Sequence, residues 1–504
     1  MKIKHLLLAI SLTAVAAGAS AADFTVGGIS YNIISVGRQT CEVTNIGGQR
    51  YYTGDIVVPE KVVDSYDNTE YTVIAVGQSA FSYCEELKSV TLPNTIQQFK
   101  KDAFGGAGLE SLTIPTSCKY IGESCFWGAK LKSITIPGNV DTIQNHTFRM
   151  CKQLTSLTLD EGVKYVGAKA FTNCETLTDV KLPQSLNSIG DHAFQGCEKL
   201  ASIVIPDGIE NYGGGLFEEC PLLTDISVAA GSTRFMAIDG VLFSKDGKIL
   251  YEYPFGKKET YYYPDERTEQ VWDYAFEKNS VLTSIKLGAA VRSIGAYTFN
   301  AVENLTDIDL GGALETIGEH AFMDCQKVKE FNFPPTLRHI ASMAISRAYG
   351  ITKIVLPNSV ESLGDWAFFG CENVPEIRIG SGLKTMAKTV FQRCYGVNTV
   401  YSEAMVPPVA DGLQFQADNY AKSTLHVPAG TKEAYAAAEG WKEFSQIVDD
   451  LPASGIEGIY DAADAQSEYF TLDGRRLTEP EQGTVCIRRT RSAAGVETHK
   501  VIIR

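Results

Sequence analysis

The sequence is poor in the residues and motifs on which most enzyme chemistry depends. Its 504 residues include only 7 histidines, and none lies in the H-E-x-x-H pattern that binds zinc. No G-x-S-x-G elbow, P-loop or dinucleotide-binding fingerprint is present. Acidic residues are plentiful, but they fall on predicted turns and strand faces, and no two stand out as a catalytic pair. We therefore predict that the protein is not an enzyme and uses no cofactor or metal.

Long apolar stretches are missing after the first 21 residues, and nothing there resembles a membrane helix. The apolar run Leu6–Ala17 is shorter than the roughly 20 residues that a bilayer span requires. It follows Lys2 and Lys4 and precedes the small residues Ala19–Ala21, which is the order of a secretory signal peptide. We predict that residues 1–21 are cleaved near Ala21, that the protein is secreted to the outer surface or the medium, and that the mature chain has no membrane-spanning segment. An uncleaved N-terminal anchor is the alternative.

Positive charge is also scarce. The chain has 45 lysines and arginines against 60 aspartates and glutamates, which gives a formal net charge of −15. An acidic chain repels phosphate backbones, so we expect no nucleic-acid partner.

What the sequence does contain is a repeat. Aromatic residues recur every 22 or 23 residues, with one interval of 59 and one position where Ile345 replaces the ring. We call these residues the anchors: Phe81, Phe104, Phe126, Phe148, Phe171, Phe194, Phe217, Phe276, Phe299, Phe322, Phe368 and Phe391. Such self-similarity is the signature of a solenoid, and it overrides a domain count based on length.

Each repeat reads approximately I-G-x-x-A-F-x-x-C-x-x-L-x-x-I-x-L-P, as in Ile189–Pro206. The alternation of apolar and polar residues before the Pro predicts a short strand with one buried face, which the Pro ends. The Phe, Cys and Leu at three-residue intervals predict one helical or 3₁₀ turn that leads to the next strand. Gly recurs four residues before the anchor, where we expect a backbone bend that a side chain would obstruct. One repeat cannot bury its own Phe and Leu, so the repeats must stack.

These A-F-x-x-C-x-x-L-x-x-I-x-L-P units resemble the BspA-type leucine-rich repeats of bacterial surface proteins over about residues 70–450. The resemblance implies a protein that is secreted or surface-exposed, and several members of the family are described as adhesins for host matrix proteins or other cells. We therefore expect a β-rich repeat solenoid: a leucine-rich-repeat stack with a parallel sheet of short strands, one short helical or 3₁₀ turn per repeat, and β-caps at both ends.

The repeats are expected to span residues 71–450 between two caps. Residues 22–70 alternate as short strands with Gly turns and predict an N-terminal β-cap. In the C-terminal cap, at about residues 402–450, Leu425–Pro428 predicts one last strand. The apolar residues Tyr435, Trp441, Phe444 and Ile447 predict a short helix that closes the stack.

The interval of 59 residues holds one ordinary repeat and an insertion at about residues 229–264. Two alternating apolar runs flank Lys245–Lys248, whose Asp-Gly pair predicts a β-hairpin. Tyr261–Pro264 then resumes the repeat. A structural role and a ligand-contacting role are both open for this hairpin, and similar hairpins in related family members favour the structural one.

After the solenoid, residues 451–466 predict a linker and residues 467–504 a small C-terminal β-module. Its three expected strands are Tyr469–Leu477, Gly483–Ile487 and Lys500–Arg504. The module is similar to C-terminal sorting domains that direct outer-membrane export and surface attachment in some bacteria. An additional β-cap without a transport role is the alternative.

Eight of the 12 cysteines lie three residues after an anchor: Cys84, Cys151, Cys174, Cys197, Cys220, Cys325, Cys371 and Cys394. A ladder of disulfides would suit an oxidising compartment. However, Ala107, Ala129 and Val302 take the same position in other repeats. A position that accepts Ala or Val is a small apolar core site, so we predict reduced, buried thiols. The sequence gives no account of Cys41, Cys118, Cys125 and Cys486.

Two outward columns are candidates for contact with a partner. The first flanks the buried residue of each strand and becomes charged in the later repeats, where we select Asp307, Asp309, Glu330, Lys353, Glu376, Arg378 and Tyr401. The second lies two residues before the anchor and includes Tyr274, Tyr297, His320 and Trp366. Exposed aromatic rings are enriched at recognition surfaces. A solvated strand face and gap-filling rings are the respective alternatives.

From these observations we predict a non-catalytic binding protein, an adhesin that recognises a protein or glycan on host or neighbouring cells through the solenoid face. A long solenoid offers more surface than the roughly 800 Å² per partner that specific recognition uses. The alternatives are a structural scaffold of the cell envelope without a dedicated ligand and a glycan-processing enzyme, which would need two positioned carboxylates.

Overall fold

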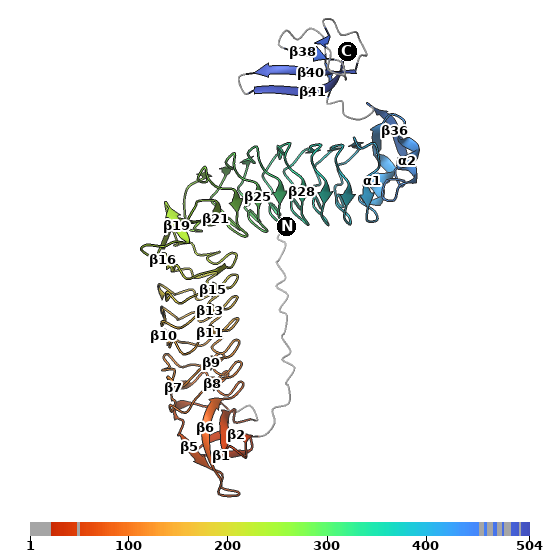
Figure 1. The fold of residues 1–504 in the computed structure, drawn as a ribbon. Helices are drawn as coiled ribbons and strands as arrows, with labels where there is room; N and C mark the ends of the chain where they lie inside the picture. The colour runs from red at the N-terminus through yellow and green to blue at the C-terminus, as the bar shows by residue number, and fades with distance from the viewer. Residues whose placement is uncertain are drawn as a thin grey trace, which may run out of the picture. The chain divides into compact units, whose positions relative to one another are not determined.

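The computed structural model describes residues 22–47 and 51–452, together with the strands at 458–460, 467–470, 476–477, 485–492 and 495–503. The predicted signal peptide lies outside the described residues. The chain forms two compact units, of which unit 1 ends at Leu222 and unit 2 begins at Leu223. Most of each unit consists of stacked coils, here called rungs, and each rung corresponds to one sequence repeat (Figure 1).

A rung of unit 1 illustrates how the repeat folds. The alternating segment Ser156–Leu159 forms a strand that buries Leu157 and Leu159 and turns its Ser and Thr outward. A second, two-residue strand at Tyr165–Val166 buries Val166. The anchor Phe171 then lies in a turn that returns to the next rung, and its side chain is fully buried. The predicted solenoid with parallel strands is confirmed.

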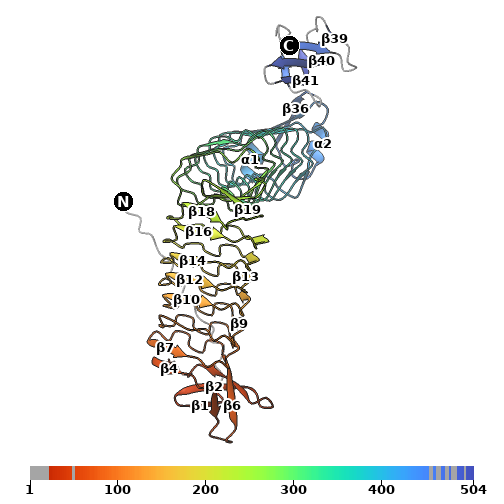
Figure 2. The ribbon, with the colours of Figure 1, turned by 60° about the vertical axis from the view of Figure 1, so that its left-hand side comes forward.

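Unit 1 contains an 11-stranded sheet, in which β1–β3 and β5 are antiparallel to a neighbour and the later strands are parallel. Its members are β1 (Phe24–Val26), β2 (Ile29–Ser35), β3 (Thr40–Thr44), β5 (Lys61–Val63), β6 (Glu70–Val76), β8 (Gln98–Phe99), β9 (Tyr120–Ile121), β11 (Thr142–Ile143), β13 (Tyr165–Val166), β15 (Ser188–Ile189) and β17 (Asn211–Tyr212). On another side of the coils lie β4 (Gly54–Val57), β7 (Leu87–Thr91), β10 (Ser133–Ile136), β12 (Ser156–Leu159), β14 (Asp179–Lys181) and β16 (Ser202–Ile205). Figure 2 shows β10, β12 and β14 on one side and β9 and β13 on the other.

Unit 2 begins with β18 (Asp225–Val228) and contains a 10-stranded sheet. The sheet comprises β19 (Phe235–Ile238), β20 (Val241–Ser244), β21 (Ile249–Glu252), β23 (Gln270–Val271), β25 (Ser293–Ile294), β27 (Thr316–Ile317), β28 (His339–Ile340), β30 (Ser362–Leu363), β32 (Thr385–Met386) and β34 (Val409–Ala410). Another wall of the coils carries β22 (Tyr261–Tyr262), β24 (Ser284–Lys286), β26 (Asp307–Asp309), β29 (Ile354–Leu356), β31 (Glu376–Ile379), β33 (Thr399–Ser402), β35 (Thr424–Pro428) and β36 (Gln446–Leu451).

The insertion is a pair of hairpins. The predicted turn at Asp246-Gly247 connects the antiparallel strands β20 and β21. A further antiparallel pair, β19 and β20, meets at Asp239-Gly240, which the sequence analysis did not select. β22 then pairs in parallel with β24, as expected for the resumed repeat.

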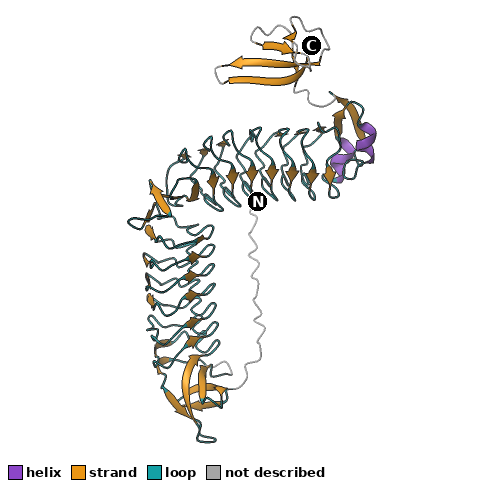
Figure 3. Ribbon diagram, viewed as in Figure 1, coloured by secondary structure: helices purple, strands orange, loops and turns teal. Residues whose placement is uncertain are grey.

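The C-terminal cap differs from the prediction in two respects. Two short helices, α1 (Ala417–Lys422) and α2 (Lys432–Ala437), are present instead of one, and they are the purple elements in Figure 3. Helix α2 carries Tyr435 but ends before Trp441 and Phe444, while Ile447 lies on β36. The prediction of one helix was wrong because the backbone becomes extended at Ala438, so the apolar spacing belongs to three successive elements. β36 also follows β35 in the sheet, so Leu425–Pro428 is not the last strand.

The C-terminal residues form a five-stranded sheet with the order β37-β41-β40-β38-β39. Its strands are β37 (Gly458–Tyr460), β38 (Ser467–Phe470), β39 (Arg476–Leu477), β40 (Val485–Ser492) and β41 (Gly495–Ile503). β37 falls inside the segment predicted as a linker, and Tyr469–Leu477 holds two strands rather than one. Among the described residues of the whole chain, no helix has the length and apolar character needed to cross a bilayer.

The core is a ladder of stacked rings. In unit 1, Phe126 and Phe148 are 5.0 Å apart with planes 7° from parallel, and Phe148 and Phe171 are 5.2 Å apart at 5°. Offset stacking at these separations is favourable beyond the burial of apolar area. The anchor spacing in the sequence thus becomes a continuous column of rings.

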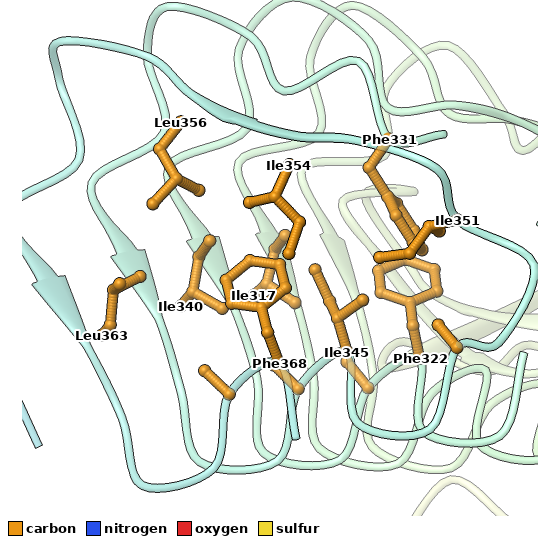
Figure 4. Close-up of a cluster of buried hydrophobic side chains, with 14 of the residues drawn as sticks. Ile317, Phe322, Phe331, Ile340, Ile345, Ile351, Ile354, Leu356, Leu363 and Phe368 are labelled. Atoms are coloured by element: carbon orange, nitrogen blue, oxygen red, sulfur yellow. The ribbon is translucent and has the colours of Figure 1, made fainter. Parts of the chain in front are cut away.

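In unit 2 one anchor position lacks an aromatic ring, and two rings from another wall fill the space. Ile345 lies between the rungs of Phe322 and Phe368, and Figure 4 shows Phe331 reaching into this region from another wall. The ring of Phe331 is 5.1 Å from that of Phe322, and Phe333 continues the contact toward Phe368. Two rings in strand positions therefore compensate for the smaller anchor.

The turn that carries each anchor is more irregular than the predicted helical or 3₁₀ turn. Thr147, Arg149 and Cys151 donate their N–H groups three residues back within the rung, which is the 3₁₀ pattern. His146, Phe148 and Met150 instead donate to the next rung. This alternation requires positive φ angles two residues before and two residues after the anchor, at 59° for His146 and 64° for Met150. Such angles cost roughly 1–2 kcal/mol for residues other than glycine.

The repeated glycines have a different role from the expected bend. Gly190 has no positive φ, but a Cβ atom there would lie 2.5 Å from the backbone nitrogen of Ala168 in the preceding rung. A Cβ at Gly213 or Gly295 would lie 2.6 Å from the corresponding backbone nitrogen. Glycine is therefore needed because adjacent backbones approach closely.

All eleven cysteines among the described residues are buried free thiols. In seven of the eight ladder positions the sulfur contacts the carbonyl oxygen of the preceding anchor position, as for Cys151 to Phe126 at 3.0 Å and Cys174 to Phe148 at 3.3 Å. Cys84, in the first of these rungs, instead contacts the carbonyl oxygen of Ser82 at 3.8 Å. The thiol thus acts as a weak donor as well as a small apolar group. Cys118 takes a position otherwise held by aliphatic residues such as Val140, and Cys125 one held by Ala103. Cys486 has no described side chain.

Candidate partner-binding surface

The charged strand column is exposed because the strand alternates. On β26, Asp307 and Asp309 face solvent on either side of Ile308, which is buried. Glu330 occupies the same column before the buried Phe331, although no strand is formed there. Lys353, Glu376, Arg378 and Tyr401 continue the column on later rungs. The structure therefore places the seven residues selected for this column on one wall, in two adjacent lines that flank the buried residues, and we call them together the strand column.

Most charges in the strand column are paired across rungs. Lys353 contacts Glu330 at 2.8 Å, and this contact lowers the pKa of the Glu330 carboxyl. Asp309 lies 3.7 Å from Lys286, and Asp307 accepts a hydrogen bond from Ser284 at 3.1 Å. Exposed ion pairs of this kind contribute about 0–1 kcal/mol each. They arrange the charges more than they stabilise the fold.

The end of the strand column forms a connected group. The guanidinium of Arg378 lies 4.3 Å from the ring centre of Tyr401 and 3.1 Å from the carboxylate of Glu403. Tyr401 stacks on His426 at 4.8 Å, and Nδ1 of His426 contacts Asp450 at 2.8 Å. These contacts hold long side chains in fixed positions at the surface, which reduces the entropy that they lose on binding.

The second column, two residues before the anchor, is largely a packed stack. Tyr274 and Tyr297 are 4.9 Å apart and 1° from parallel, and Tyr297 and His320 are 4.4 Å apart at 6°. Burial raises the pKa of Tyr297 and lowers that of His320, where the nearby Glu319 opposes the effect. Since the rings cover one another's faces, their edges are what a partner could reach.

Trp366 is the exception in this second column. Its side chain is 40% exposed, and its ring meets Phe369 edge-on at 6.3 Å. An exposed Trp that a neighbouring ring holds in place is typical of the residues that contribute most to binding at a protein interface.

The two columns do not form one site. The strand column runs along the wall that contains β26, β29, β31 and β33, whereas the second column follows the strands of the 10-stranded sheet. In Figure 4, Ile354 and Leu356 enter the core from the first wall and Ile340 and Leu363 from the second. A partner that contacts Arg378 and one that contacts Trp366 would therefore approach different walls.

The sequence analysis missed a third column, the residues that immediately precede the strands of the 10-stranded sheet. They alternate in charge along the unit: Lys248, Glu269, Arg292, Glu315, Arg338, Glu361 and Lys384. Lys248 contacts Glu269 at 2.8 Å, and Glu361 contacts both Arg338 and Lys384 at 2.6 Å. Aligning the repeats at 23-residue spacing would have revealed this alternation. Most of these charges pair with one another along the column, so we expect the column to favour packing in register over binding.

Comparisons with known proteins agree with this architecture. The profile of the BspA type leucine-rich repeat region matches residues 67–177, 119–245 and 269–398. A leucine-rich cell surface protein from Faecalibacterium prausnitzii is 25% identical, covers 75% of this chain and 93% of its own, and superposes with a TM-score of 0.54. The pneumococcal vaccine antigen PcpA has the same fold, with 19% identity, coverage of 86% and 100%, and a TM-score of 0.50. Among curated proteins, none matches the sequence.

Proposed function

This chain belongs to the BspA-type leucine-rich repeat family, and we propose that it is a secreted or cell-surface protein that binds other proteins. More specifically, we propose an adhesin that recognises a protein or glycan on host or neighbouring cells. The similar protein from Faecalibacterium prausnitzii is itself described as a cell surface protein. In this proposal residues 1–21 direct secretion, and the C-terminal sheet of β37–β41 acts as a sorting and attachment module.

The observation that carries the proposal is the group around Arg378 in unit 2. Arg378, Glu376 and Tyr401 remain accessible to solvent, with the side chain of Arg378 38% exposed, yet each is held by a neighbour. Arg and Tyr are the residues that most often dominate interface energetics. A surface that presents them in a fixed geometry can bind a partner without ordering long side chains first.

The experiment measures binding of the purified full-length secreted chain to immobilised extracellular-matrix proteins, mucins and glycans. Two variants test the surface, and both use residues that other rungs place at the same position. Tyr401→Thr copies Thr158, which takes the equivalent strand position in unit 1, and Trp366→Ser copies Ser124, which also lies two residues before its anchor. We expect Tyr401→Thr to weaken binding by about tenfold or more, whereas a loss in Trp366→Ser alone would place the partner on the wall of the second column.

Lys132→Gln serves as the control, because Lys132 is an exposed, ion-paired residue of unit 1. Equal loss of binding in this control would point to a general effect on the fold. Binding that survives both test variants would contradict the proposed surface, and the absence of any binding across the collection would favour a scaffold without a dedicated ligand.

A further inference from the structure

The outward face of the 11-stranded sheet in unit 1 carries a feature that the strand column does not explain. In each rung one residue of the short strand points outward, and in most rungs it is small or polar: Gln98, Thr142, Ser188 and Asn211. At two rungs it is tyrosine. Tyr120 on β9 is 44% exposed and Tyr165 on β13 is 43% exposed.

The two tyrosines are separated by one rung. β9, β11 and β13 are consecutive parallel neighbours, and Thr142 of β11 lies directly beside Tyr165. Adjacent strands are roughly 4.8 Å apart, so the backbones that carry the two tyrosines are about 10 Å apart, with Thr142 on the strand between them. Figure 1 shows β9, β11 and β13 following one another along the stack.

Each tyrosine is preceded by an exposed lysine, Lys119 or Lys164, with Asp141 on the rung between them. In unit 2 the third column takes the equivalent positions, and its side chains form ion pairs of 2.6–2.8 Å. Here, among the described residues, neither lysine has an ion-pair partner, and Asp141 accepts a hydrogen bond from Thr142 at 2.9 Å. Both ammonium groups are therefore available to a ligand.

The backbone holds both Lys-Tyr pairs in place. The N–H groups of Lys164 and Tyr165 both donate to the carbonyl oxygen of Asp141, at 2.8 and 3.0 Å. The following residues, Ile121 and Val166, are buried in the core. The rigid face thus presents two aromatic rings and two cations with the same separation of two rungs.

We infer that this face binds a linear acidic polysaccharide that carries a carboxylate on every second sugar. One sugar of an extended β-linked chain is about as long as one rung is high, so alternate sugars meet alternate rungs. Tyrosine rings offer flat apolar faces to the C–H faces of sugars and hydroxyls to their oxygens. The lysines would then pair with the carboxylates of the same alternate sugars.

An acidic peptide fits this face less well. An extended peptide presents side chains on one face about every 7 Å, which does not match a separation of about 10 Å. General attraction of a polyanion is also excluded as an explanation, because the net charge of the chain is −15 and repels polyanions at long range. Binding would depend on these local contacts. The inference concerns unit 1 and does not rest on the surface proposed around Arg378.

The test measures the affinity of the full-length chain for an oligosaccharide of alternating glucuronic acid and N-acetylglucosamine. The comparison probes are a neutral N-acetylglucosamine oligosaccharide of equal length and a poly-glutamate peptide. Two double variants are used, Tyr120→Thr with Tyr165→Ser and Lys119→Gln with Lys164→Asn. Each new residue is one that a neighbouring rung has at the same position, so we expect both variants to fold. Lys152→Gln, at a lysine paired with Glu175 elsewhere in unit 1, is the matched control.

We expect the acidic oligosaccharide to bind, each double variant to weaken binding about tenfold, and Lys152→Gln to leave it unchanged. The inference is overturned if the neutral oligosaccharide binds equally well, if poly-glutamate binds in preference, if the acidic oligosaccharide does not bind, or if both double variants bind as the parent chain does.

Discussion

The thiol of Cys325 lies 3.1 Å from the carbonyl oxygen of Phe299, one rung earlier in unit 2. The same contact joins Cys371 to Ile345 and Cys394 to Phe368, each at 3.3 Å. The ladder of cysteines is therefore a ladder of weak hydrogen bonds between rungs, and it lies directly beside the ring stack. This contact between rungs distinguishes cysteine from Ala107 at seven of the eight ladder positions, Cys84 being the exception.

Replacing Cys325 by alanine removes both the sulfur contact and its volume. We expect Cys325→Ala to fold and to lose about 1 kcal/mol in the free energy of unfolding. Urea unfolding followed by intrinsic fluorescence would measure the loss, and Cys371→Ala should reproduce it. A change below about 0.3 kcal/mol in both variants would mean that the sulfur contact adds nothing to packing.

The buried thiols also predict a loss of stability at high pH. Burial raises the pKa of the Cys151 thiol to about 12, and that of Cys118 to about 11, from an ordinary value near 9. Above pH 9 the unfolded chain releases these protons while the folded chain keeps them. Their contribution to stability is therefore fully present below pH 9 and is lost as the pH rises toward 12.

The urea midpoint should thus fall between pH 9 and pH 11, and Cys151→Ala should fall less steeply than the parent chain. At pH 8, iodoacetamide should label none of the eleven described cysteines until the chain is unfolded. Rapid labelling of Cys151 in the native chain would contradict the burial on which this prediction depends.

Close packing of adjacent rungs makes Gly190 sensitive to a single methyl group. In Gly190→Ala the new Cβ would lie 2.5 Å from the backbone nitrogen of Ala168 and 2.9 Å from its Cα. Because backbone atoms cannot rotate away, we expect a loss of more than about 2 kcal/mol, seen as a lower Tm.

Gly312→Ala is the matched control for Gly190→Ala. A Cβ at Gly312 meets no heavy atom within 4 Å, and its backbone is not left-handed. We expect this variant to be neutral or slightly more stable than the parent chain. If both glycine variants behaved alike, the backbone approach at Gly190 would not be the reason for the glycine.

Ile345 occupies an anchor position, and we predict that the effects of changing Ile345 and Phe331 on stability are coupled. Ile345 is fully buried, and Phe331 already fills the neighbouring volume. Restoring the consensus ring alone, in Ile345→Phe, should overpack the core and cost about 1–3 kcal/mol. Adding Phe331→Ile should recover much of that loss, and a double-mutant cycle would measure the coupling. Additive effects of the two changes would indicate that the residues do not share one volume.

Local periodicity was enough to predict the repeat, the burial of the anchors and most of the strands that a Pro ends, although no strand forms before Pro115 or Pro334. Each follows from local periodicity, since a single repeat has an apolar face that only its neighbours can cover. The cysteine column was also predictable, because the same position holds Ala107 and Val302 in other repeats. The strand column was predictable because alternation along one strand sets which side chains face outward.

Contacts between rungs decided the rest. Three features depend on residues from different repeats, so the pattern within one repeat does not reveal them. They are the need for glycine at position 190, the filling of the ring column by Phe331, and the ion pair between Arg338 and Glu361. The tertiary structure also placed Trp366 and Arg378 on different walls. Alternation along one strand sets which of its side chains face outward, but it does not set the wall on which that strand lies.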